Sequence, residues 1–326
     1  MMIHSLGPPP SDAEVDAWLA VLTAAVAADQ PQLEAPSRRE VAGRLCVPPA
    51  LGRPVLWAAG EGAGEGAGVA ALLLFTDEGN AHTAFLDVLT VRPQERRRGV
   101  GTALWARVRE ELLAQGRTSV SALVDLGGPG QAFAQSLGFE NVLPMAWYEQ
   151  ELPADGPAPV PATPGYELLT WHGPVPDAWA PAAAVAHGAM QDAPTGDMDE
   201  RIPVWTAQRL HAVQQVIVDR GGELITVAAV TGAGEVAAYT ELVLPDPSGR
   251  RAIQYDTVVT PAHRGHGLGR AVKLRMAAEA AGRYPALRRI ATTVADENTP
   301  MRAVNEALGY RRERGAGIFQ LTMQPA

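Results

Sequence analysis

The segment VVTPAHRGHGLGRAVK, residues 258–273, joins a strand-like apolar run to a helix-like run and contains three glycines and two arginines. Successive glycines allow backbone N–H groups to approach an anion without hindrance from Cβ atoms. The helix that follows adds unpaired N–H groups and a partial positive charge at its first turn. A strand, an Arg-x-x-Gly-x-Gly turn and a helix therefore suit a pyrophosphate, although a single copy is also compatible with a flexible loop.

The chain contains this segment twice. VRPQERRRGVGTAL, from Val91, parallels VTPAHRGHGLGRAV, from Val259. Three other matches occur in the same order: DAW at residues 16–18 and 177–179, GVAALLLF with EVAAYTELVL, and AFAQSLGFE with AVNEALGYR. The period, about 165 residues, is the size of a domain and not of a solenoid repeat. We predict a duplicated domain, and the recurrence favours phosphate binding over a plain loop.

Two other phosphate motifs are excluded. The chain has no G-x-x-x-x-G-K-[ST] sequence, which a P-loop requires. GAGEGA, from Gly62, fits the spacing of a dinucleotide-binding turn, but two expected strands flank it. That motif needs a helix directly after it, so we discount it.

Composition limits the class of protein and its partners. The chain has 326 residues, with 27 Lys+Arg against 36 Asp+Glu and a net charge of -9, which disfavours binding to nucleic acid or to an anionic membrane. Cys46 is the only cysteine, so we expect no disulfide framework and no thiolate metal site. The opening MMIHSLGPPP does not resemble a signal peptide, and no apolar run is long enough for a membrane helix. We predict a soluble cytoplasmic protein.

A proline-rich segment separates the repeats. ELPADGPAPVPATPG, residues 151–165, holds five prolines and no apolar periodicity, as expected of an extended linker. We predict domains at residues 1–152 and 165–326, joined by a linker at residues 153–164.

Each domain has the same order of expected elements. VLWAA with VAALLLF, and LITVAAV with VAAYTELVL, predict hairpins, and TAFLDVLTV and AIQYDTVV predict the next strands. Apolar spacing predicts a helix after each glycine turn, ended by Gly116 in the first domain and by Gly282 in the second. A further strand and a last helix complete each domain. The expected fold class is α/β (α+β), a mixed sheet with helices on both faces.

Both domains resemble the GNAT (GCN5-related) N-acetyltransferases. The two glycine segments are similar to the V-x-P-x-x-R-x-x-G-x-G acyl-CoA motif of that family, and SLGFE and ALGYR are similar to its closing G-F segment. The resemblance covers nearly the whole chain, twice, in an arrangement similar to the mycothiol-synthase-type acetyltransferases of actinobacteria. It implies two tandem GNAT domains, each with a sheet splayed between the strand before the turn and the next strand. It also implies acetyl-CoA (CoA) as co-substrate and no metal.

The resemblance assigns acyl-CoA contacts in both domains, with the pyrophosphate on the turn and the pantetheine along the preceding strand. In the second domain these residues are Thr257, Val258, Val259, Arg264, Gly265, His266, Gly267, Leu268, Gly269, Arg270 and Asn298, the last of which alternatively caps a helix. In the first domain they are Leu89, Thr90, Val91, Arg96, Arg97, Arg98, Gly99, Val100, Gly101 and Thr102. We assign catalysis to the second domain and a structural or CoA-binding role to the first.

Acetyl transfer to an amine needs a polarised thioester carbonyl, a neutral amine and a proton for the leaving thiolate. In the family a tyrosine usually supplies that proton, but its position holds Ala134 in the first domain and Asn305 in the second. Asp87 occupies one of the family's base positions in the first domain. A solvated strand carboxylate is the alternative role for Asp87.

Two carboxylates give the second domain more candidate chemistry. Asp256 lies on the strand next to the expected thioester, and Glu241 lies on the neighbouring strand, aligned with Leu74 of the first domain. A carboxylate inside an apolar strand often marks a site, while an outward-facing edge position is the alternative for Glu241. The candidate catalytic residues are Asp256, Glu241, Asn305 and Asp87.

The segment HGAMQDAPTGDMDE, from His187, corresponds to the part of the family that covers the acceptor, so Asp192 and Met190 are candidate substrate contacts. An ordinary solvated loop is the alternative. We predict an N-acetyltransferase that acts on a small-molecule amine by direct transfer in a ternary complex, as a monomer or homodimer. The alternative, motivated by the missing tyrosines, is a non-catalytic acyl-CoA-binding sensor or scaffold. A thiol-biosynthesis enzyme of the mycothiol type is disfavoured, because Ile253 and Asn305 stand where its acid–base pair is expected.

Overall fold

The structure is a computed structural model that describes residues 2–60, 66–153 and 158–323. The chain forms two compact units. Unit 1 consists of Met1–Pro144, Gly196–Arg201 and Ala316–Ala326, and unit 2 consists of Met145–Thr195 and Ile202–Gly315. Residues 61–65, within which the GAGEGA motif begins, and residues 154–157 of the expected linker lie outside the described residues.

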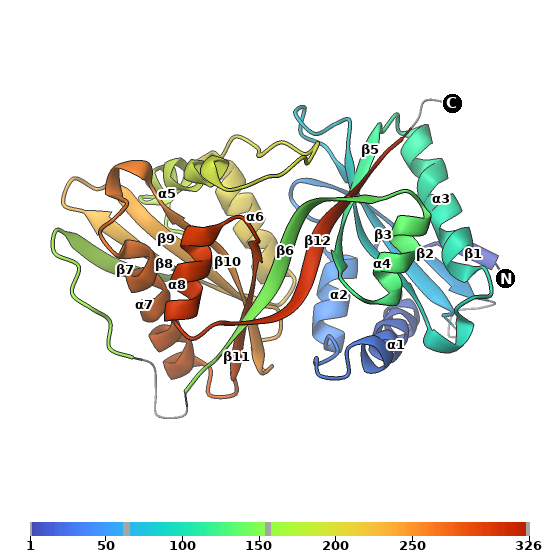
Figure 1. Ribbon diagram of the computed structural model, residues 1–326, viewed down its shortest axis with the longest axis horizontal. Coiled ribbons are helices and arrows are strands. Elements are labelled where there is room, and N and C mark those ends of the chain that lie inside the picture. The colour runs from blue at the N-terminus through green and yellow to red at the C-terminus, as the bar shows by residue number, and fades with distance from the viewer. Residues whose placement is uncertain (1, 61–65, 154–157, 324–326) are drawn as a thin grey trace. The chain divides into compact units, whose positions relative to one another are not determined.

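Unit 1 is a mixed sheet with helices packed on both faces (Figure 1). Its strands follow the order β1-β2-β3-β4-β5-β12, and β4 with β5 is the parallel pair. The strands are β1 (Met2–Ser5), β2 (Gly52–Gly60), β3 (Gly68–Phe75), β4 (Ala84–Val91), β5 (Ser119–Asp125), the start of β6 (Glu140–Glu151) and the end of β12 (Arg311–Thr322). The helices are α1 (Asp12–Asp29), α2 (Arg38–Cys46), η1 (Pro93–Glu95), α3 (Val100–Ala114) and α4 (Pro129–Ser136).

Unit 2 repeats this plan, with the strand order β6-β11-β10-β9-β8-β7. Besides the rest of β6, its strands are β7 (Tyr166–His172), β8 (Glu223–Thr231), β9 (Val236–Leu244), β10 (Arg251–Val259) and β11 (Arg289–Ala295). Its helices are α5 (Ala180–His187), η2 (Gly188–Asp192), α6 (Ala207–Asp219), η3 (Pro261–His263), α7 (Leu268–Arg283) and α8 (Thr299–Ala307). Gly282, expected to end α7, lies inside the helix, because the αL residue typical of a glycine stop is absent there and Tyr284 forms the C-cap.

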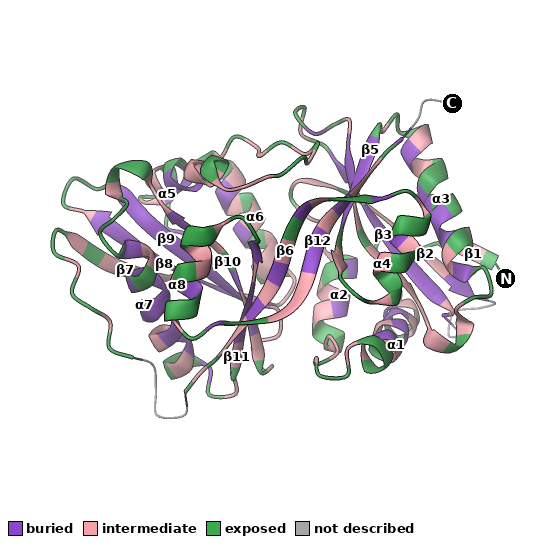
Figure 2. Ribbon diagram, in the orientation of Figure 1, coloured by how far each residue is buried: buried purple, intermediate pink, exposed green. Residues whose placement is uncertain are grey.

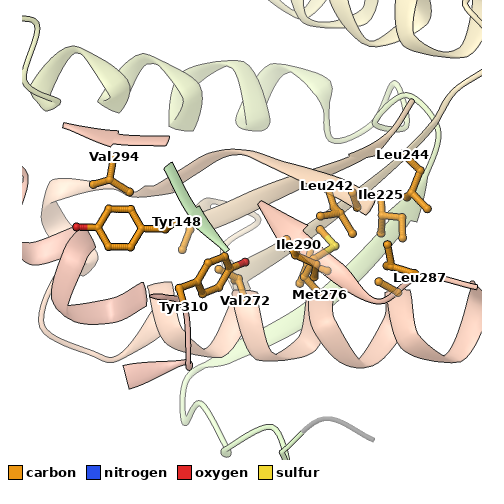
Figure 3. Close-up of a cluster of buried hydrophobic side chains, with 14 of the residues drawn as sticks. Tyr148, Ile225, Leu242, Leu244, Val272, Met276, Leu287, Ile290, Val294 and Tyr310 are labelled. Atoms are coloured by element: carbon orange, nitrogen blue, oxygen red, sulfur yellow. The ribbon is translucent and has the colours of Figure 1, made fainter. Parts of the chain in front are cut away.

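Strand β9 of unit 2 is buried along its whole length (Figure 2), as expected of a strand covered on both faces. Leu242 and Leu244 join the cluster under α7, whereas Tyr239 joins the cluster on the opposite face with Ala186 of α5. Figure 3 shows Val272 and Met276 of α7 against the first of these faces. Neighbouring residues of β9 therefore serve two different layers, because side chains alternate along a strand.

The last strand of each sheet comes from the other repeat. Residues Met145–Glu151 of β6 pair antiparallel with β11 in unit 2, and Ala316–Thr322 of β12 pair antiparallel with β5 in unit 1. These two strands, which follow the LGF and LGY segments, were not predicted from the sequence. The sequence repeats and the compact units therefore differ by an exchange of these strands.

Both sheets open at the parallel pair, as the resemblance implied. In unit 2, β10 pairs with β11 only from Arg251 to Ile253. In unit 1, β4 and β5 share the single pair Phe85 and Ser121. The C-terminal halves of β4 and β10, which lead to the glycine turns, therefore lack a neighbour on that side, and this confirms the predicted mixed, splayed sheet.

Candidate active site

The glycine turn of unit 2 leads from η3 into the first turn of α7. Gly265 and Gly267 have φ angles of +81° and +74°, a left-handed conformation that favours glycine. Gly267 is the N-cap of α7, and no side chain caps the helix. The N–H groups of Leu268, Gly269 and Arg270 lie in the first helical turn and therefore have no intrahelical acceptor. They form a group of donors suited to a phosphate.

The turn of unit 1 has the same conformation with one difference. Gly99, the N-cap of α3, has a φ of +83°, and α3 also lacks a side-chain cap. Arg97 has a φ of 61° at the position that Gly265 occupies in unit 2. A non-glycine residue in this region is strained, so the turn geometry persists in unit 1 in spite of its local cost.

The motif arginine forms the same ion pair in each unit. Arg264 donates to Asp192 at 2.5 Å, and Arg96 donates to Asp29 at 2.6 Å. Both arginines also donate from Nε to the last carbonyl of the preceding strand, on Val259 and on Val91. Asp192, a predicted substrate contact, therefore lies against the arginine of the glycine turn.

The other predicted cofactor contacts are distributed around these turns. Thr257 to Val259 and Leu89 to Val91 lie on the halves of β10 and β4 that pair with β9 and β3 but, among the described residues, not with β11 and β5. The His266 ring contacts the carbonyl oxygens of His263 and Arg264. Asn298 caps α8 by accepting from the Met301 N–H at 3.2 Å, which corresponds to its alternative role as a cap.

A β-bulge sets the position of the carboxylates in unit 2. Gln254 pairs with Leu242 and Thr257 pairs with Thr240, so two residues of β10 oppose Glu241 alone. The corresponding bulge in unit 1 lies between the pairs Leu72–Leu86 and Ala71–Val88.

This register corrects the sequence alignment of Glu241. Ala238 pairs with Val259 as Gly68 pairs with Val91, and counting from there places Glu241 at the position of Ala71, not of Leu74. The alignment was three residues in error because it matched the letters VAA of the two strands, at residues 69–71 and 236–238, and not the pairing of the strands. The positions that hold the apolar residues Ala71 and Val88 in unit 1 thus hold the acidic residues Glu241 and Asp256 in unit 2.

Glu241 is a buried carboxyl group with one amide partner. Its side chain accepts from Gln214 Nε2 of α6 at 2.6 Å, and Gln214 Oε1 accepts from the Val175 N–H at 2.9 Å. Burial, reinforced by the negative charge of Asp256, raises the pKa of Glu241 to about 7. Glu241 therefore faces α6 and is not an outward-facing edge residue.

Asp256 is linked to a buried histidine that the sequence analysis did not identify as a candidate. His187 Nε2, at the end of α5, lies 3.1 Å from Asp256 Oδ2. The Tyr239 hydroxyl contacts His187 Nδ1, and the Trp205 ring lies on the imidazole with ring centroids 3.8 Å apart.

The chemistry of these groups sets the direction of their hydrogen bonds. A carboxylate only accepts, so a neutral His187 carries its proton on Nε2 and accepts at Nδ1 from Tyr239. Burial, with the charges of Glu241 and Asp256, raises the pKa of Tyr239 well above its ordinary value, which keeps the donor proton in place. The Asp256 side chain is 36% exposed, so this carboxylate remains accessible to a substrate.

The remaining candidates lie elsewhere. Asp87 of unit 1 accepts twice from Arg44 at 2.7 Å. Asn305 is fully buried and accepts from Lys273 Nζ at 2.6 Å. Met190 packs in the cluster that contains Tyr239 and Val258.

Neither His187 nor Tyr239 carried a sequence signal. His187 ends an alanine-rich helix in the Asp192 segment, and Tyr239 lies in an apolar strand. Because side chains alternate along a strand, Tyr239, two residues before Glu241, lies on the same face as Glu241. This alternation is the one pattern from which Tyr239 could have been inferred.

Comparison with known proteins bears on the chemistry of this site. A family model described as the acetyltransferase (GNAT) family matches residues 26–139 and 190–310. No curated protein matches the chain. A structure described as a tandem GNAT protein from the clavulanic acid biosynthesis pathway, without AcCoA, is 28% identical, has a TM-score of 0.82 and covers 100% of both chains. A GCN5-related N-acetyltransferase from Sphaerobacter thermophilus is 18% identical, with a TM-score of 0.68, over 99% of this chain and 96% of that one.

Among the described residues, no group of three or more His, Cys, Asp and Glu side chains has an arrangement that suits a metal ion. Over the same part of the chain, no helix combines the length and the apolar character needed to cross a membrane.

Proposed function

The chain belongs to the acetyltransferase (GNAT) family, and on that premise we propose that unit 2 transfers an acetyl group from acetyl-CoA directly to the amine of a small molecule in a ternary complex. The observation that carries this proposal is the partly exposed Asp256 with the buried His187 and Glu241 beside the bulge of β10. Unit 1 has apolar residues, Ala71 and Val88, at the two carboxylate positions.

The donor would be held by the turn and by the open half of β10. The uncapped first turn of α7 supplies N–H groups for the pyrophosphate. Extended backbone from Thr257 to Val259, without a partner strand on the β11 side, is available for the amide groups of pantetheine. A backbone N–H at the bulge would polarise the thioester carbonyl.

The acceptor amine would approach on the face that carries the carboxylates. An alkylammonium must lose a proton before it attacks, and a carboxylate in hydrogen-bond reach can take that proton. In the proposed step the amine nitrogen bonds to the carbonyl carbon, its proton passes to Asp256, and the carbon–sulfur bond breaks. The thiolate that leaves then takes a proton. Two neighbouring carboxyl groups also favour a cationic acceptor over an anionic one.

His187 would act as a positioning residue for Asp256. Its Nε2–H fixes one oxygen of the carboxylate, while Tyr239 and Trp205 hold the imidazole itself. Glu241, with a pKa raised to about 7, is in part protonated at neutral pH, which reduces its repulsion of Asp256.

The test is thiol release from acetyl-CoA in the presence of a panel of small amines, with Asp256→Asn and, for the candidate base of unit 1, Asp87→Asn. We expect the Asp256 variant to lose about 100-fold or more in rate, the usual contribution of a general base. Loss of activity only in Asp87→Asn would transfer the chemistry to unit 1. CoA binding without turnover over the whole panel would instead support the acyl-CoA sensor.

Calorimetric titration with acetyl-CoA locates the donor site. Gly269→Glu is a suitable change because a Cβ there meets only Val259, at an ordinary 3.5 Å. A glutamate in the first turn also suits the helix while repelling a phosphate. Gly101→Glu is the matched variant of unit 1. Full acetyl-CoA binding by the Gly269 variant would contradict the assignment to unit 2.

A further inference from the structure

Unit 2 contains a second polar cluster, and it is built around the single lysine of the chain. Of the 27 Lys+Arg residues, 26 are arginines, and the remaining one is Lys273 of α7. Lys273 is only 4% exposed and donates from Nζ to Asn305 Oδ1 at 2.6 Å. Arginine stays protonated in proteins, whereas a buried lysine can give up its proton. The single lysine of the sequence is thus buried inside unit 2.

The cluster holds a cation but no counter-charge. Among the described residues no ion pair joins Lys273 to a carboxylate, and its other neighbour is the Tyr310 ring, 4.7 Å from Nζ. Burial lowers the pKa of Lys273 to about 7. Asn305 is fully buried, and its Nδ2 has no hydrogen-bond partner in the described part of the chain. A buried donor without an acceptor is costly, so Asn305 Nδ2 is available to an acceptor that reaches it.

This cluster and the carboxylates lie on opposite faces of the same two strands. Thr240 and Gln254 contact each other, and Gln254 accepts from Tyr310 at 3.0 Å on the α7 side. Figure 3 shows Tyr310 beside α7 on this face. Glu241 contacts Gln214 of α6 instead, and Asp256 contacts α5. The α7 side carries the amine of Lys273, and the other side carries the carboxyl groups of Glu241 and Asp256. Both groups lie where β10 no longer pairs with β11.

Unit 1 has apolar residues at every corresponding position. The fourth residue after the last glycine of the turn is Lys273 in unit 2 and Trp105 in unit 1, and Trp105 packs edge-on against Phe139 at 5.3 Å. Leu86 stands at the position of Gln254 in the strand register, and Ala134 at that of Asn305. The fold therefore does not require the polar cluster, which points to a role in unit 2 alone.

We infer that Lys273 donates the proton that the leaving thiolate takes, while the Asn305 amide holds Nζ and donates from Nδ2 to the sulfur. This inference rests on the proposed function. The amine attacks from the carboxylate face, the carbon–sulfur bond breaks toward the Lys273 face, and one proton moves from the ammonium of Lys273 to sulfur. Neutral Lys273 then regains a proton from solvent as the thiol departs. Acid and base thus act from opposite faces of the opening.

Because the chain has one lysine, ¹³C-labelled lysine gives one side-chain signal to follow by NMR. In wild-type protein we expect bound CoA to raise the pKa of Lys273. We also expect the thiolate absorbance of bound CoA to appear at lower pH than that of free CoA. S-methyl-CoA, which cannot form a thiolate, is the control and leaves the lysine signal almost unchanged. Equal effects of the two ligands, or none, would overturn the inference even if the protein is an active acetyltransferase.

Kinetics provide a second measurement. Lys273→Met removes a buried charge and retains the chain length, so folding is not expected to suffer. We expect about a 100-fold lower rate with acetyl-CoA, largely restored with an acetyl thioester of a less basic thiol, which leaves without a proton. Arg275→Met, on the exposed side of the same helix, leaves both rates unchanged. Failure of the less basic thioester to restore the Lys273→Met rate would contradict the proton transfer.

Discussion

His187 and Asp256, which lie 69 residues apart in sequence (256 − 187), meet in unit 2 with Nε2 at 3.1 Å from Oδ2. The histidine is buried, the carboxylate is partly exposed, and the Tyr239 hydroxyl contacts the other ring nitrogen. Such an arrangement orients a carboxylate without removing it from the reach of a substrate.

The first prediction concerns His187. We expect His187→Gln to lower kcat about 10-fold and to leave acetyl-CoA affinity unchanged, because the amide retains only part of the contact to Asp256. Tyr239→Phe is the weaker companion, since it removes one hydrogen bond to the imidazole. The measurement is kcat and KM for both substrates. A change confined to the KM for acetyl-CoA would place His187 at the donor instead.

The pH dependence of stability provides the second prediction. The pKa of Glu241 is about 7 in the folded protein against 4.5 without the fold, so the folded state binds this proton more tightly. The stabilisation is complete below pH 4.5 and is lost as pH rises through 7. We expect Glu241→Gln to remove this loss, on the order of 3 kcal/mol at pH 8. Urea unfolding at pH 5 and pH 8 tests it, and equal pH slopes for both proteins would contradict it.

The third prediction concerns the segment Gly196–Arg201, which belongs to unit 1 although it follows α5 in sequence. Buried Asn80 donates to the Arg201 carbonyl at 2.8 Å and accepts from the Arg201 N–H at 2.7 Å. We expect Asn80→Ala to destabilise the protein by about 1–3 kcal/mol, because both backbone groups lose their partner. Urea unfolding measures this change, and Glu78→Ala, at an exposed position of the same turn, is the control.

The fourth prediction uses the difference between the two glycine turns. Arg97 adopts a φ of 61° where Gly265 stands in unit 2. We expect Arg97→Gly to stabilise the protein by about 1 kcal/mol and Gly265→Ala to destabilise it by a similar amount, because only glycine adopts this conformation without strain. Thermal unfolding of the pair checks the signs, and the same sign for both substitutions would be contrary to the expectation.

The fifth prediction concerns the ion pair of Arg264 with Asp192. The pair occupies a guanidinium that would otherwise be available to a phosphate. We expect Asp192→Asn to increase the affinity for CoA several-fold, most strongly at low salt. Asp29→Asn is the matched change at Arg96 of unit 1. Weaker CoA binding by the Asp192 variant would assign the aspartate a role in holding the turn in shape.

The parts of the fold that depend on local pattern were predictable. Glycines with positive φ, the apolar spacing of α3 and α7 and the duplication are all properties of contiguous residues, and the comparisons confirm the GNAT family that these motifs indicated. The strands β6 and β12 were missed, because their pairing joins residues such as Met145 and Ala295 that are far apart along the chain.

The candidate site, like the fold, was predictable from the sequence only in part. Sequence by itself determined the two glycine turns and drew attention to Asp256 and Glu241, since glycine spacing and a carboxylate in an apolar strand are visible in a short window. Only the tertiary structure placed His187 against Asp256 and Lys273 against Asn305. The reason is the bulge in β10 together with the alternation of side chains, which decide which residues of β9 and β10 face α5 and α6 and which face α7 and α8.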